Sequence, residues 1–185
     1  MKLLNLPACS VLTLLLGLSS LAGCSKDTAS QSDSELPATQ AVAATAAADL
    51  LLVSEPAGAG DVIAVRQQAS DGDDVVVVGR IGGSENPWIE GRAAFSIVDN
   101  SLKACSDIEG DGCPKPWDYC CETARLADAS ALIKVVDADG KLIAEDAKQL
   151  LGVRELSTVV AQGKAQRDEA GNLTVLASAI YVKAK

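Results

Sequence analysis

Runs of apolar and β-branched residues, separated by polar turn-forming residues, fill the chain from about residue 75 to residue 182 and predict β-strands. They lie at 75–81, 92–99, 131–137, 158–164 and 173–182. In the second run Ala93, Phe95 and Ile97 take every other position, which is typical of a strand with one buried face. The segments 71–74, 138–141 and 168–172 are rich in Asp, Asn and Gly and predict turns. The chain is therefore expected to be mainly β.

Two short helices are expected beside these strands. Apolar residues at 62, 65 and 69 recur at spacings of three and four after Asp61, which predicts a helix over 61–69. A second helix is expected over 144–151, ending near Gly152. Within the first strand, Gly79 suggests a sharp bend. The alanine-rich segment 41–52 has a high helix propensity, but tertiary contacts would have to stabilise a helix there.

The order of three strands, a helix and two strands resembles the OB-fold over residues 75–182. The resemblance rests on this order, on Val-x-Gly-Arg-Ile at 77–81 and on Phe-x-Ile-x-Asp at 95–99. It implies a small five-stranded OB-like barrel with one or two short helices and a cysteine-rich insertion, at about 102–130, between strands two and three. Another small β-sandwich or barrel is the competing interpretation. The haem chaperone of cytochrome c maturation has a similar pattern, but this chain lacks its haem-attaching histidine, so the resemblance does not extend to haem binding.

Composition excludes several classes of function. The chain contains no histidine, which removes the Ser-His-Asp and Cys-His nucleophile systems and histidine-ligated catalytic zinc. Only 3% of the residues are aromatic and the net charge is -9, so the chain is poorly suited to stack on bases or approach a phosphate backbone. We therefore expect a non-enzymatic protein without a cofactor and without a nucleic-acid partner.

The first residues have the pattern of an export signal. Lys2 precedes an apolar run at 11–18, and small residues follow it. The sequence Leu21-Ala22-Gly23-Cys24 resembles the lipobox of bacterial lipoproteins. The resemblance implies cleavage after residue 23, lipid attachment to Cys24 and acylation of the new N-terminus, so that the lipid chains anchor the protein to a membrane.

The predicted organisation is a signal peptide at 1–23, a lipidated cysteine with a flexible tether at 24–48, and the OB-like domain at 49–185. The tether is rich in Ser, Thr, Ala and Gln and carries too little apolar surface to fold alone. Ser25, in place of an aspartate, favours the outer membrane, with the domain facing the periplasm.

The insertion contains the most distinctive residues of the domain, and its Pro-Trp-Asp-Tyr-Cys-Cys segment resembles one found in a group of uncharacterised exported lipoproteins. Four cysteines occur in it, namely Cys105, Cys113, Cys120 and Cys121. In an oxidising compartment an even number predicts two disulfide bonds. Because neighbouring cysteines tend to point in different directions, the bonds are expected to be either 105–120 with 113–121 or 105–121 with 113–120.

Other uses of the insertion are the alternatives. The four thiolates could form a metal site, which would make this a metal-handling protein. That hypothesis requires two adjacent cysteines to reach one ion. A redox role for the adjacent pair is another alternative, although no flanking base or helix N-terminus is evident to lower a thiol pKa. Calcium binding is a further one, because Asp107, Glu109 and Asp111, with Asp118 at the twelfth position, loosely match the ligand spacing of an EF-hand loop.

The two tryptophans of the chain, Trp88 and Trp117, each follow a proline in a predicted loop. They are candidates for aromatic anchors of a binding surface. Tyr119, Glu90 and Arg92 are the candidates beside them. The alternative is that both rings only cover the barrel or pack against the cysteines. The resulting hypothesis is an envelope lipoprotein that binds a protein or small ligand through these loops.

Overall fold

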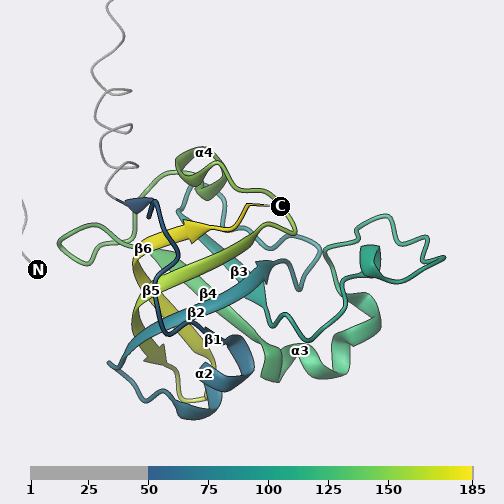
Figure 1. Ribbon diagram of the computed structural model, residues 1–185, viewed down its shortest axis with the longest axis horizontal. Helices are drawn as coiled ribbons and strands as arrows, with labels where there is room; N and C mark the ends of the chain where they lie inside the picture. Colours follow the sequence, from purple (N-terminus) through teal and green to yellow (C-terminus); the bar gives the residue numbers. More distant parts are fainter. Residues whose placement is uncertain (1–49, 185) are drawn as a thin grey trace, which may run out of the picture. The chain divides into compact units, whose positions relative to one another are not determined.

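Five strands close into a barrel in the computed structural model, which describes residues 50–184 (Figure 1). Its strands, in chain order, are β2 (Asp74–Ile81), β3 (Ala94–Val98), β4 (Ser130–Val135), β5 (Thr158–Arg167) and β6 (Leu173–Val182). They are hydrogen-bonded in the order β2-β3-β4-β6-β5, and β5 pairs back to β2. The β4–β6 pair is parallel, and the others are antiparallel. The predicted fold class, a small five-stranded OB-like barrel, is confirmed.

The barrel strands agree closely with the predicted runs. The largest difference is β5, which continues three residues beyond 164 to Arg167 because its pairing with β6 resumes after a bulge at Gln162/Gly163. A strand of two residues, β1 (Gly60–Asp61), adds in parallel to β2. One edge of β2 is thus shared by β1 and β3.

Gly79 lies in the unbroken strand β2 and permits close packing there. A Cβ atom at this position would lie 2.9 Å from the carbonyl oxygen of Val98 and 3.1 Å from a methyl carbon of Val62. The helix α2 and the strand β3 can approach β2 closely only because the side chain is missing.

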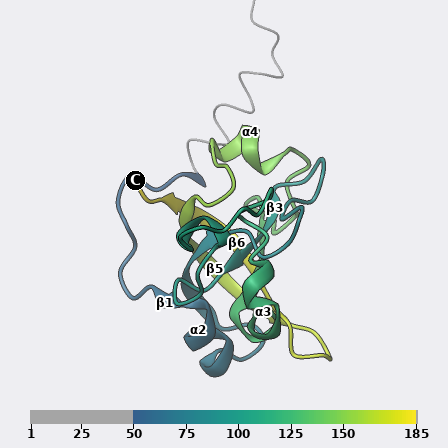
Figure 2. The same ribbon diagram turned by 90° about the vertical axis from the view of Figure 1, so that its right-hand side faces the viewer.

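Three α-helices surround the barrel in the described part of the chain: α2 (Val62–Gln68), α3 (Thr123–Ala129) and α4 (Ala147–Leu151). Helices α2 and α3 lie side by side at one end, and α4 lies at the other end (Figures 1 and 2). The two predicted helices correspond to α2 and to α4, which begins three residues later than expected. The sequence did not predict α3, because only Leu126 and Ala129 of its seven residues are even partly buried.

The N-terminus of α2 is capped from a distant part of the chain. Asp61 occupies the capping position, but its side chain makes no capping bond. Instead the Ile63 amide donates to Oδ2 of Asp99, at 2.8 Å, and the Ser101 amide donates to Oδ1, at 2.9 Å. Burial raises the pKa of Asp99, but these amide hydrogen bonds outweigh it, and the pKa lies below its usual value. The buried carboxylate therefore ties α2 to the end of β3.

Two apolar clusters fill the domain. The larger lies inside the barrel and includes Phe95, Ile97, Ile133, Val175 and Ile180, all fully buried. A smaller cluster underlies the insertion and consists of Val98, Leu102, Ala104, Tyr119 and Ala129. The insertion is consequently packed against the barrel by its own small core, and its outer part projects to the right in Figure 1.

Candidate functional site

A recess of about 350 Å³ lies between the loop 82–93, which joins β2 to β3, and the helix α4. Three of the residues that the sequence singled out line it, namely Trp88, Glu90 and Arg92. The remaining lining residues are Asn86, Ile89, Asp146, Ala147, Lys148 and Gln149. The fold thus brings part of the predicted binding loop together with a helix that lies more than fifty residues later in the sequence.

The Trp88 ring is fixed in place by contacts on several sides. Its Nε1 donates to Oε1 of Glu155 at 2.7 Å, and Nζ of Lys148 donates to the same oxygen at 2.6 Å. The Lys148 ammonium also lies 4.8 Å from the centre of the indole ring, within the range of a cation–π interaction. On the barrel side, the ring centre of Phe95 is 5.8 Å away. The indole is therefore held rigidly between the core and the recess.

The pKa of Glu155 reflects this arrangement. Partial burial alone would raise it, but the hydrogen bonds from Lys148 and Trp88 outweigh burial and lower the pKa below its ordinary value. Glu155 is thus a carboxylate at neutral pH and accepts from both donors. It therefore positions the tryptophan beside the recess.

The rim of the recess combines an exposed apolar side chain with charges of both signs. Ile89 is 42% exposed, and in the described residues only Val53 is another large apolar side chain exposed to that degree. Glu90 and Asp146 supply negative charge, while Arg92 and Lys148 supply positive charge. The recess is suited to an apolar group that is surrounded by polar or charged ones.

A second recess, of about 380 Å³, lies beside α2 and β2. Its walls include Val65, Gln68 and Asp73 but no aromatic residue. None of the residues proposed from the sequence lines it.

Trp117 lies against the loop 82–93 and does not line the recess. Its Nε1 donates to the carbonyl oxygen of Glu85 at 3.1 Å, and its own carbonyl oxygen accepts from the Gly83 amide at 2.9 Å. Lys115 and Glu85 form an ion pair beside it. Trp117 is half-buried, so its clearest role here is to connect the insertion to the loop that carries Trp88.

The placement of Tyr119 on the binding surface is wrong. Its side chain is fully buried and packs with Leu102 and Ala104 in the small cluster beneath the insertion. The hydroxyl group is also buried and has no hydrogen-bond partner among the described residues. A ring of this size supplies apolar burial that the insertion otherwise lacks, which explains its position.

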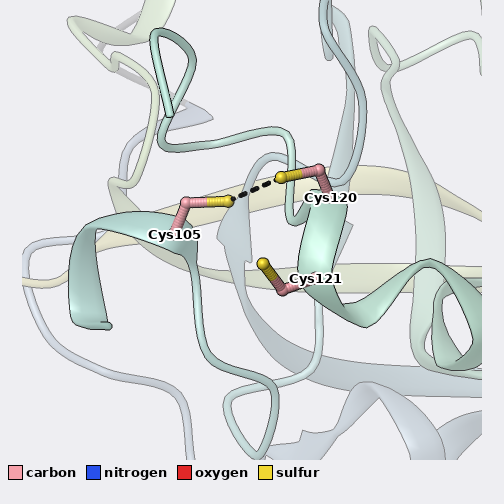
Figure 3. Close-up of side chains that lie close together, drawn as sticks. All are labelled: Cys105, Cys120 and Cys121. Atoms are coloured by element: carbon pink, nitrogen blue, oxygen red, sulfur yellow. Dashed lines mark hydrogen bonds between the residues drawn. The ribbon is translucent and has the colours of Figure 1, made fainter. Parts of the chain in front are cut away.

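Three cysteines of the insertion, Cys105, Cys120 and Cys121, lie close together (Figure 3). The sulfur atoms of Cys105 and Cys120 are 3.3 Å apart, and those of Cys120 and Cys113 are 3.7 Å apart. The sulfurs of Cys105, Cys120 and Cys121 all lie within 4.8 Å of one another. All four residues are free cysteines in the structure, so neither of the two predicted disulfide pairings is formed there. We refer to these four residues as the thiol cluster.

The expectation that adjacent cysteines point in different directions is wrong here. Figure 3 shows the sulfurs of Cys120 and Cys121 turned toward Cys105. Both residues lie in the short helix η2 (Cys120–Glu122), of the 3₁₀ type. Such a helix has about three residues per turn, so neighbouring side chains diverge by about 120° and not by the 180° of a strand. Both thiols can therefore reach the same partner.

Neighbouring thiols change the acidity of Cys120. Hydrogen bonds with Cys105 and, secondarily, with Cys113 raise the pKa of Cys120 to about 12. This is the opposite of the lowered pKa that reactive, nucleophilic cysteines have. The raised pKa therefore does not favour Cys120 as a nucleophile.

The acidic residues of the insertion are not arranged as a calcium loop. Asp107 pairs with Arg80, which is the main reason that its pKa lies below the ordinary value. Asp111 accepts a hydrogen bond from the Cys113 amide at 3.0 Å. Among the described residues, the only group that meets the spacing of a metal site is the trio of Cys105, Cys120 and Cys121.

Comparison with protein-family models finds no family that matches this chain, and no curated protein matches it either. Within residues 50–184, no helix is long and apolar enough to cross a membrane. The lipobox residues Leu21 to Cys24, the predicted tether and most of the alanine-rich segment lie outside the described residues.

Proposed function

We propose that this chain is a non-enzymatic lipoprotein, anchored at the cell envelope through Cys24, whose OB-like barrel binds a partner protein in the recess beside Trp88. The observation that carries the proposal is the convergence of Trp88, Glu90 and Arg92, chosen from the sequence alone, on one recess with α4. The lipobox and the polar tether support the anchoring.

The chemistry of the recess favours one apolar side chain of a polypeptide as its occupant. Trp88, Ile89 and Ala147 provide an apolar surface, and a volume of about 350 Å³ is enough for a single large side chain. Ligand pockets in general span about 300–1,000 Å³, so this one is at the small end of the range. The mixed charges of the rim suit the polar backbone and flanking side chains of a peptide.

The rigidity of Trp88 also favours binding. Because Glu155, Lys148 and Phe95 already fix the indole, little side-chain entropy is lost when a partner packs against it. Fixed aromatic residues of this kind are enriched among the residues that dominate interface energies.

Selection of binding peptides tests the proposal. The purified full chain, in detergent micelles, is used to select peptides from a random phage-displayed library, and the selected peptides are titrated by tryptophan fluorescence. We expect peptides with one essential apolar residue. Ile89→Asp is expected to weaken them at least about tenfold, which corresponds to about 1.4 kcal/mol.

Val53→Asp is the matched control, because Val53 is fully exposed and does not line the recess. It is expected to leave the affinities unchanged. Peptides that bind equally well to both variants would place the binding surface elsewhere and contradict the proposal.

A further inference from the structure

The sulfurs of the thiol cluster gather at one place, which two separate pairs of cysteines would not require. Binding of a partner in the recess beside Trp88 does not account for this arrangement either. Three sulfurs converge within 4.8 Å of one another (Figure 3). Cys113 adds a fourth sulfur 3.7 Å from that of Cys120. These residues come from two separate segments, η1 (Cys105–Asp107) and the stretch 113–121. Convergence of this kind needs both segments to be placed by the surrounding structure.

We propose that Cys105, Cys120 and Cys121, with Cys113 as the fourth ligand, bind a thiophilic d¹⁰ metal ion, either Zn²⁺ or Cu⁺. The site is independent of the recess beside Trp88 and goes beyond the binding function proposed above.

The sulfur separations match those of a metal–thiolate site. With zinc–sulfur bonds of about 2.3 Å, the sulfurs of a tetrahedral site are about 3.8 Å apart, and those of a trigonal site are about 4.0 Å apart. The measured separations of 3.3 Å and 3.7 Å are slightly shorter than these values, and the remaining ones of the trio are below 4.8 Å, whereas Cys113 lies outside the trio. An ion placed among the sulfurs of the trio would need the Cys105–Cys120 contact to lengthen by about half an ångström, and Cys113 would have to move closer to the trio to become the fourth ligand.

The local backbone is arranged to direct both adjacent cysteines to one point. Tyr119, immediately before them, has a φ of 58°, in the left-handed region that residues other than glycine rarely adopt. Its fully buried ring holds it in this conformation. The helix η2 then begins at Cys120, so that the two thiols leave the backbone on the same side as Cys105. The structure therefore answers the objection that adjacent cysteines cannot reach one ion.

Cys105 is placed equally firmly on the other side. It is 1% exposed, and Asp107, two residues later, both pairs with Arg80 and accepts from the Ala104 amide at 3.2 Å. These contacts fix η1 to the strand β2. Cys120 and Cys121 are exposed, which leaves one side of the site open for an ion to enter.

The chemistry of binding is an exchange of protons for the metal ion. Four thiols that bind Zn²⁺ release four protons to the solvent, and the resulting four-thiolate site carries a charge of −2. Three thiols that bind Cu⁺ release three protons. No electron is transferred in either case, and soft thiolate sulfur selects such ions over calcium or magnesium.

Metal titration of the reduced full chain tests the proposal. The purified chain, kept under reductant and without oxygen, is titrated with Zn²⁺ or with Cu⁺, desalted and analysed for metal and protein. We expect one ion per chain. Co²⁺ in place of Zn²⁺ is expected to show thiolate-to-metal charge-transfer bands and the d–d bands of tetrahedral cobalt. Zn²⁺ is expected to remove these bands.

Single substitutions distinguish the two metals and control for folding. Cys120→Ser is expected to abolish stoichiometric binding of both metals, and Cys24→Ser, the same change outside the cluster, to leave it intact. Cu⁺ binding that survives Cys113→Ser indicates a three-coordinate copper site, whereas loss of Zn²⁺ in that variant indicates a four-coordinate zinc site. Circular dichroism of each variant verifies that it folds.

Two outcomes would overturn the proposal. One is a reduced, folded chain that retains less than about 0.1 ion per molecule, far below the occupancy that structural zinc sites reach. The other is a chain isolated from cells with both pairs of these cysteines joined as disulfides. Neither result would contradict binding in the recess beside Trp88, because that proposal is tested separately by peptide affinity. Ile89→Asp, which is expected to weaken peptide binding, is expected to leave metal binding unchanged.

Discussion

Replacing Gly82 by alanine should weaken the packing of the insertion against the barrel, because a side chain at Gly82 would collide with residues of the insertion. It is buried at the end of β2, in the loop that leads toward Trp88. A Cβ atom there would lie 2.6 Å from the carbonyl oxygen of Trp117 and 2.9 Å from a ring carbon of Tyr119. The neighbouring amide, of Gly83, donates to the same Trp117 oxygen at 2.9 Å.

The size of the effect follows from how little these neighbours can move. Ordinary contact begins at 3.4 Å, so the Trp117 carbonyl must retreat by about 0.8 Å. The Tyr119 ring is fully buried and cannot turn away. Overpacking of this kind costs about 1–3 kcal/mol, and a weakened hydrogen bond from Gly83 adds up to about 1 kcal/mol. We expect Gly82→Ala to lower the free energy of unfolding by about 2–3 kcal/mol.

Urea unfolding, followed by circular dichroism, measures this change. Gly112→Ala is the matched control, because a Cβ there meets nothing within 4 Å and needs no unusual backbone angle. It should change stability by less than about 0.5 kcal/mol. Since Tyr119 immediately precedes Cys120 and Cys121 of the thiol cluster, Gly82→Ala should also weaken Co²⁺ binding, while Gly112→Ala should not. Equal stability of the two variants would refute the proposed packing of the insertion.

Three further predictions concern other parts of the chain. Because the pKa of Asp99 is lowered in the folded state, its contribution to stability is complete above the ordinary value of 3.8 and is lost as the pH falls through the lower, folded value. Acid titration of the free energy of unfolding should therefore show a fall below about pH 4 that is smaller in Asp99→Asn. Gly163→Ala should destabilise the barrel by more than Gly82→Ala, since its Cβ would lie 2.0 Å from the carbonyl oxygen of Leu176, and thermal unfolding measures this. Cys24→Ser should prevent incorporation of labelled fatty acid and release the chain from the membrane fraction, and persistent labelling would contradict the lipobox interpretation.

The strands could be predicted from the sequence because their pattern is local. Runs such as 75–81 and 173–182 combine β-branched residues with turn-forming ends, and they became β2 and β6. Three of the candidate binding residues, Trp88, Glu90 and Arg92, could be chosen together because they lie within five positions of one another in one loop.

The features that were missed depend on contacts between distant segments. Helix α3 has little apolar periodicity, and Asp99 caps α2 from 36 residues away, beyond what a sequence pattern shows. Tyr119 looks like a loop aromatic in sequence, yet it is the centre of a small core. Its left-handed backbone angle determines where Cys120 and Cys121 point, and residue type alone does not reveal that angle.

Photo-crosslinking in cells tests the central claim, that the recess beside Trp88 binds a partner protein, most directly. A photo-reactive residue is introduced at Ile89 or, as a control, at Val53, and the cells are irradiated. The account predicts one discrete adduct from position 89, attached at an apolar residue of the partner, and none from position 53. No adduct from position 89, or the same adducts from both positions, would contradict it.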